Sequence, residues 1–308
     1  MASIDQAVGM AQTEIKASAA NAAGTPPAPA LQYALAAVVV AAVAFTFAPV
    51  LLRMGRQWWN DPNFSHGFLV PLFSGFLVWQ RRDRLKRLPA AGSWTGALIL
   101  LFGLAVLVVG TLGAELFLSR VSLLFVICGL IVMLRGWATF RELLFPWAFL
   151  ALMIPIPAII FNQFTLKLQF MASKLGSSIL PLCGVPVYRE GNVIFLPAMP
   201  LEVAEACSGI RSLISLGALA VMYGYFMQKR VLGRILLAAA AVPIAIIANA
   251  LRIVGTGIAV QYWDPATALG FFHEFSGWVI FVISTGLLLL TSRLLRWVPG
   301  VRQTEVAA

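Results

Sequence analysis

The chain has 308 residues, of which 60% are hydrophobic and 11% are charged, and its mean hydropathy is +0.90. These values exclude a soluble globular domain and indicate an integral membrane protein. The formal net charge of +10 does not indicate nucleic-acid binding, because the basic residues flank apolar runs, as membrane topology requires.

The first thirty residues, rich in Ala and Pro, predict a disordered cytoplasmic tail over 1–30. They lack the basic start and short apolar core of a cleavable signal, so the first apolar run is expected to remain as an anchor. An all-α multi-pass membrane domain is predicted over 31–297, followed by a cytoplasmic tail over 298–308. About eight segments are long and apolar enough, or nearly so, to span a bilayer: 31–52, 64–80, 94–114, 120–137, 143–161, 207–228, 232–254 and 273–295.

Two of these segments are irregular. The second is short and follows the turn-like sequence Asn60-Asp-Pro-Asn63. The fifth contains Pro146, Pro155 and Pro157, so it is expected to be kinked or to end early.

The fifth and sixth segments are joined by the only sizeable polar connection, 162–206. Its first part, 164–175, mixes Lys167 and Lys174 with apolar residues at helical spacing and predicts a helix in the membrane interface. Its second part, 185–197, carries β-branched and aromatic residues around Gly191-Asn192 and predicts a small hairpin.

The distribution of Lys and Arg predicts the orientation. The dense cluster 81–87 is expected to be cytoplasmic, which puts the N-terminus inside and the 162–206 connection outside.

Three polar residues are predicted at one depth. Measured along their helices from the inner basic residues at about 1.5 Å per residue, Cys207, Arg252 and His273 lie roughly 33, 27 and 30 Å away. Each distance is about one hydrocarbon thickness, so all three are expected at the outer boundary on consecutive helices. Together they would supply a nucleophile, a cationic stabiliser and a proton carrier.

Each residue also has a simpler interpretation. Cys207 would be a small apolar residue at a helix start, Arg252 would reach the headgroups, and His273 would mark a helix start. Cys128 is predicted in the core. Because every Asp lies outside the apolar runs, an intramembrane aspartyl dyad is not expected. Two histidines without a His-Glu-x-x-His sequence argue against a zinc protease, so neither a metal nor another cofactor is expected.

Five sequence blocks resemble the exosortase/archaeosortase family over roughly 60–295. The most distinctive is Glu205-Ala-Cys-Ser-Gly-Ile-Arg211, and the others are Ser65-His-Gly-Phe-Leu-Val-Pro71, Gly191-Asn-Val-Ile-Phe-Leu-Pro197, Asn249-Ala-Leu-Arg-Ile253 and Phe272-His273 with Gly277-Trp278.

The resemblance implies a multi-pass cysteine protease or transpeptidase of the bacterial inner membrane, with its site at the periplasmic face. Its expected partners are membrane lipids and exported proteins with a C-terminal sorting tail: a Pro-Glu-Pro-type motif, a spanning helix and a basic cluster. Such systems accompany exopolysaccharide production. It implies that Cys207 is the nucleophile, that Arg252 stabilises the oxyanion, and that His273 is the general acid/base.

Four further residues are expected to support the site or bind substrate: Arg211, Glu205, His66 and Asn249. Arg211, one turn after Cys207, would lower the thiol pKa, hold a substrate carboxylate, or pair with Glu205 or Glu202. A Cys183–Cys207 disulfide is conceivable in the periplasm but would block the nucleophile. Hydrolysis and transfer to an acceptor amine both remain open, and the rivals are a non-catalytic scaffold for exopolysaccharide export and a polysaccharide ligase-like transferase.

Overall fold

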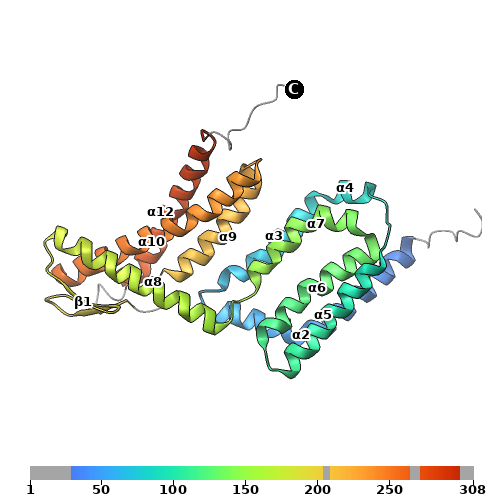
Figure 1. Ribbon diagram of the computed structural model, residues 1–308, viewed down its shortest axis with the longest axis horizontal. Coiled ribbons are helices and arrows are strands. Elements are labelled where there is room, and N and C mark those ends of the chain that lie inside the picture. Colours follow the sequence, from blue (N-terminus) through green and yellow to red (C-terminus); the bar gives the residue numbers. More distant parts are fainter. Residues whose placement is uncertain (1–28, 204–208, 264–270, 299–308) are drawn as a thin grey trace, which may run out of the picture. The chain divides into compact units, whose positions relative to one another are not determined.

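The computed structural model describes residues 29–203, 209–263 and 271–298. Most of them are helical (Figure 1). The helices are α2 (Pro29–Asn60), η1 (Ser65–Phe68), α3 (Leu69–Gln80), α4 (Arg82–Arg87), α5 (Trp94–Leu112), α6 (Leu116–Arg135), α7 (Trp137–Phe149), η2 (Leu150–Met153), α8 (Ala158–Ile179), η3 (Leu180–Cys183), α9 (Ile210–Met227), α10 (Val231–Tyr262) and α12 (Phe271–Leu295). The strands are β1 (Tyr188–Glu190), β2 (Val193–Phe195) and β3 (Pro200–Glu202).

The chain divides into two units inside α2, Met1–Leu51 and Leu52–Ala308. In the first unit, the described residues form the first part of α2, with exposed apolar side chains such as Val38, Val40 and Phe45. All other elements belong to the second unit, which is described by itself below.

The predicted all-α membrane class is confirmed, but the count of eight spans is not. Among the described residues, 6 helices are long and apolar enough to cross a membrane, or up to 7 if a bent pair counts as one span. The predicted span 64–80 is not among them. It forms η1 and α3, and the 12 residues of α3 reach only about 18 Å.

The predicted kink in the fifth segment is confirmed as a break. Helix α7 and η2 end at Met153, α8 begins at Ala158, and the two parts are bent by 78°. Pro155 and Pro157 occupy the break, where a proline ring and its missing N–H prevent a continuous helix.

Helices α5 and α6 pack through glycine. A side chain at Gly103 would meet the backbone N of Val126 at 2.9 Å, and one at Gly129 would meet the backbone N of Leu100 at 2.5 Å. Only the lack of a side chain lets the two backbones approach this closely, which is a common basis of helix association in membranes.

The predicted hairpin is confirmed and gains a strand. Glu190 pairs with Val193 across the turn Gly191-Asn192, where Gly191 has φ +62°. Strand β3 adds antiparallel to β2, giving the order β1-β2-β3. The predicted interface helix 164–175 is the middle of the longer α8.

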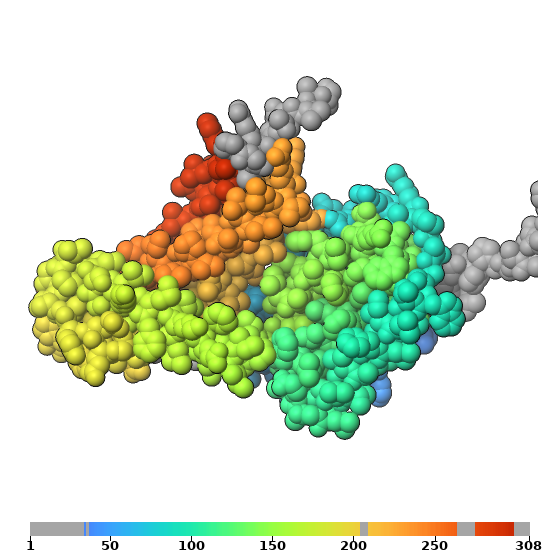
Figure 2. Space-filling model, in the orientation of Figure 1, coloured from blue at the N-terminus to red at the C-terminus, as the bar shows by residue number. Residues whose placement is uncertain are grey.

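We call α8, η3 and the three strands the cap. The cap packs on the last turns of α10, and Figure 2 shows the yellow-green side chains of α8 directly against the orange ones of α10. Their shared apolar core includes Leu180, Val185, Ile194, Leu201, Ile253, Val254 and Val260. Helix α10 was predicted to end at 254, and this packing carries it on to Tyr262.

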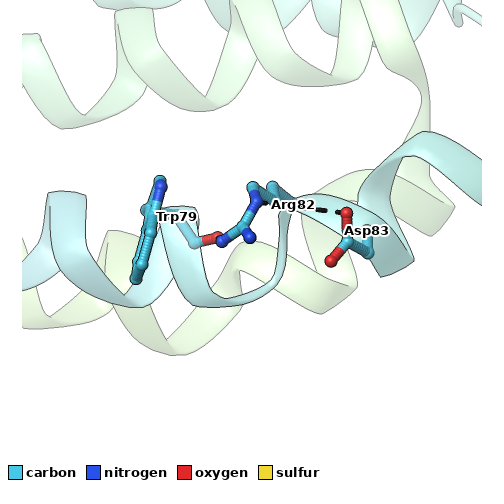
Figure 3. A network of polar contacts seen from close by, with 3 residues as sticks. All are labelled: Trp79, Arg82 and Asp83. Atoms are coloured by element: carbon cyan, nitrogen blue, oxygen red, sulfur yellow. Dashed lines mark hydrogen bonds and ion pairs between the residues drawn. The ribbon is translucent and has the colours of Figure 1, made fainter.

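The predicted inner basic cluster lies at the end of α3. The Arg82 guanidinium lies over the Trp79 ring at 4.4 Å and its Nε is 4.0 Å from Asp83 Oδ1 (Figure 3). Arg84 forms an ion pair with Glu142 of α7 at 2.9 Å. A tryptophan followed by arginines is typical of a helix end at a membrane surface.

Candidate active site

The predicted nucleophile lies on the connection between the cap and α9. Cys207 and Glu205 are outside the described residues. Before them, the backbone N–H of Val203 donates to the carbonyl of Asn192 at 3.0 Å, and the Asn192 side chain donates to the Val203 carbonyl at 3.3 Å. After them, Gly209 is the N-cap of α9. The described residues on both sides of this connection are therefore held by packing or hydrogen bonds.

Gly209 packs against Asn249 of α10. Its φ of +77° is unfavourable for any residue with a side chain, and an added Cβ would lie 2.8 Å from Asn249 Cγ. Asn249 itself is 3% exposed. The block that contains Cys207 therefore contacts the Asn249 block through Gly209, which is two residues after Cys207.

Arg252 links the same stretch of α10 to the start of α12. Its Nε donates to Ser276 Oγ at 3.3 Å, and a Cβ at Gly277 would lie 3.2 Å from an Arg252 guanidinium nitrogen. Ser276 and Gly277 are three and four residues after His273, about one helical turn. Position 273 belongs to the first turn of α12, and its side chain is outside the described residues.

A cavity of about 310 Å³ lies beside Arg252, between α10 and α12. Its polar lining is Arg252, Thr256 and Ser276, and its walls include the aromatic rings of Trp263 and Phe275. A guanidinium and two hydroxyls in an otherwise apolar cavity can orient a polar group of a bound chain.

Helices α9, α10 and α12 also meet at their opposite ends, near Arg234. The Gln228 amide donates to Ser292 of α12, to both its carbonyl and its Oγ at 2.9 Å, and Arg234 Nε donates to the Gln228 carbonyl at 2.9 Å. Heights counted from this end are therefore comparable among the three helices. Arg252 does not lie near a helix end, however, because α10 continues for ten residues beyond it.

Two other predicted residues, Arg211 and His66, have different surroundings. Arg211 is exposed in the first turn of α9, and within the described ranges it has no ion pair with Glu202. His66 lies in η1, where its Nε2 is 3.2 Å from the Leu152 carbonyl oxygen. A carbonyl oxygen can only accept a hydrogen bond, so Nε2 carries the proton in this contact.

His66 lines a second cavity of about 400 Å³, with Phe73 of α3, Ser215 and Met222 of α9, and Phe281 of α12. Neither Asn249 nor Arg252 lines this cavity. Burial lowers the pKa of the His66 imidazole, so the ring is neutral at neutral pH. His66 therefore lines a mostly apolar cavity that is separate from the described part of the α10 cluster.

The sequence analysis missed Ser276, Thr256 and Trp263. Ser276 was detectable, because it is one turn after His273 on the same helix. Of the cysteines described, Cys128 is buried in α6 as predicted and Cys183 is exposed in η3. The part of the chain that the structure describes contains no group of three or more metal-binding side chains.

Comparison with known families matches residues 58–290 to the transmembrane exosortase (Exosortase_EpsH) family model. The matched range contains all the residues discussed in this subsection except Ser292. Comparison with curated proteins and with solved structures gives no match.

Proposed function

Because the chain belongs to the transmembrane exosortase family, we propose that it is a membrane cysteine peptidase or transpeptidase that cleaves C-terminal sorting tails. One observation carries this proposal. Gly209 packs on Asn249, and the turn after position 273 packs on Arg252, three residues further along the same helix. The described parts of three sequence blocks, each holding one proposed catalytic residue, therefore meet within about one turn of α10.

In the proposed reaction, the Cys207 thiolate attacks the carbonyl carbon of the scissile peptide bond, and the carbonyl oxygen becomes an oxyanion. Arg252 stabilises this oxyanion, and Ser276 holds the guanidinium in position. His273 protonates the leaving amine as the C–N bond breaks, leaving an acyl thioester on Cys207. Water or an acceptor amine then attacks the thioester and regenerates the thiol.

The proposed substrate is an exported protein with a Pro-Glu-Pro-type motif, a spanning helix and a basic cluster. Its own helix would hold the motif at the membrane boundary. Diffusion within the membrane plane would then be enough to bring the motif to the thiolate. This requires the N-terminus in the cytoplasm and the cap on the periplasmic side of the inner membrane. The basic residues 81–87 after α3 support that orientation, because Lys and Arg are enriched on the cytoplasmic side of membrane proteins.

The test is co-expression with a tailed substrate and mass analysis of its new C-terminus. Cys207→Ala and Cys207→Ser are expected to insert normally and to leave the substrate uncut. Cys128→Ala is the matched control, because it also removes a thiol but lies in the buried face of α6. Normal processing by Cys207→Ala would refute catalysis by this thiol.

A further inference from the structure

A third cavity, of about 490 Å³, lies on another part of the second unit. It is bordered by the end of α2, the connection between α5 and α6, and the break between η2 and α8. Its polar lining consists of Gln57, Asp61, Glu115, Arg120 and Asn162. Neither Asn249 nor Arg252 lines it, so it is separate from the candidate active site.

Arg120 is the unusual residue of this cavity. It is only 6% exposed, and one guanidinium nitrogen donates to Gln57 Oε1 at 2.7 Å. Gln57 is neutral, and no carboxylate of the described residues forms an ion pair with Arg120. Glu115 stabilises this charge electrostatically but forms no ion pair with it. A guanidinium has five N–H donors, and burying them with one neutral acceptor among the described residues is costly. An oxyanion on the remaining donors would complete the site.

The charges around Arg120 limit which oxyanion fits. Arg53 is close enough to interact electrostatically and adds positive charge, whereas Asp61 and Glu115 in the lining are negative. Each carboxylate already accepts a backbone N–H, from Asn63 at 2.9 Å and from Phe117 at 3.2 Å. These four charges sum to zero, so a phosphodiester, with its single negative charge, leaves less uncompensated charge than a phosphate monoester, which carries about −1.5 to −2. The two carboxylates can also accept bonds from donors on the same ligand.

The surroundings favour a lipid over a soluble anion. Leu116, Ile156 and Ile159 line the cavity and are 45%, 41% and 76% exposed. Arg120 lies one turn inside the end of the apolar helix α6, at the height where lipid headgroups meet acyl chains. Acyl chains would cover the exposed side chains, and a soluble anion would leave them uncovered.

We propose that this cavity binds the headgroup of a membrane phospholipid, with the phosphodiester on Arg120 and the acyl chains against Leu116, Ile156 and Ile159. The bound lipid would tie together the three segments that border the cavity. This assignment does not depend on the proposed cysteine chemistry.

Purified protein in detergent is titrated with a diacyl phospholipid, and the thermal unfolding midpoint is measured. The comparison ligands are an uncharged diacyl glycoside and glycerophosphoethanolamine, which has the headgroup without the chains. Arg120→Gln removes the charge. Asn162→Asp adds a third carboxylate to the lining at an exposed position, and Gln163→Glu adds the same charge to the next residue, also exposed, which does not line the cavity.

The phospholipid is expected to stabilise the wild type and Gln163→Glu equally, and the glycoside to stabilise neither. Arg120→Gln should lose the effect, and Asn162→Asp should weaken apparent affinity on the order of tenfold, the cost of one charge-assisted hydrogen bond. If Arg120→Gln does not fold, the pair Asn162→Asp and Gln163→Glu decides. The proposed site would be refuted if Asn162→Asp and Gln163→Glu bound the phospholipid with equal affinity. It would also be refuted if the glycoside stabilised the wild type as much as the phospholipid does. Equal stabilisation by glycerophosphoethanolamine would overturn the lipid assignment in favour of a soluble phosphodiester.

Discussion

Replacement of Gly209 tests the contact that joins the cysteine block to α10. Gly209→Ala puts a side chain on a backbone with φ +77°, where an L-residue costs about 1–2 kcal/mol. The new Cβ would also lie 2.8 Å from Asn249 Cγ, so one of the two must shift by about 0.6 Å to reach the 3.4 Å of ordinary contact.

A cost of one or two kcal/mol reduces the ratio of native to altered local structure by a factor of about 5–30. Cleavage of a tailed substrate in co-expressing cells should therefore fall by up to that factor in Gly209→Ala, with membrane insertion unchanged. Gly217→Ala is the matched control, because position 217 lies on the same helix and a Cβ there would meet nothing within 4 Å.

Gly209→Asn separates the two causes. Asparagine tolerates positive φ but keeps the close approach to Asn249, so this variant should remain impaired. Full activity of Gly209→Asn beside an impaired Gly209→Ala would assign the effect to backbone strain alone. Activity of Gly209→Ala equal to that of Gly217→Ala would refute the proposed role of the contact.

Three other predictions concern the mechanism and the topology. Arg252→Lys should lose about 10²–10³ in processing rate, because lysine lacks the planar donors that hold an oxyanion, whereas near-native turnover would make Arg252 a headgroup anchor. A cysteine introduced at Asn192 should react with a membrane-impermeant reagent in intact cells, and one at Arg84 only after permeabilisation; the reverse would put the cap in the cytoplasm. Cys183→Ala should process substrate at the wild-type rate with and without reductant, since a catalytic thiol must stay free, and a requirement for Cys183 would contradict this.

The features predicted correctly are those that short-range chemistry decides. The turn at Gly191-Asn192 needs only a residue that accepts positive φ, and the break after Met153 needs only Pro155 and Pro157. The predicted end of α10 at 254 was wrong: Gly255 and Gly257 follow Val254, and glycine is common at helix ends, yet the helix continues to Tyr262. Packing against the cap, which single-sequence periodicity does not reveal, extends the helix.

The site was predictable as a set of sequence blocks but not as a set of contacts. Helical rise predicted similar heights for Cys207, Arg252 and His273, and the described neighbours of these residues meet on α10. That Ser276 would be the partner of Arg252 depends on the rotation of α12 about its axis, which spacing alone does not determine. The burial of Arg120 could not be predicted either, because it arises from segments distant in sequence.

The length of α10 has a consequence for engineering. Its final turns share a core with the cap, through Ile253, Val254 and Val260, so the natural module boundary runs through the helix and not through a loop. A chimera that exchanges the cap of one family member for that of another should therefore take residues 253–262 along with residues 158–202. Joining the donor sequence inside the helix, just after Arg252, would retain the host residues around Asn249 while transplanting an intact module.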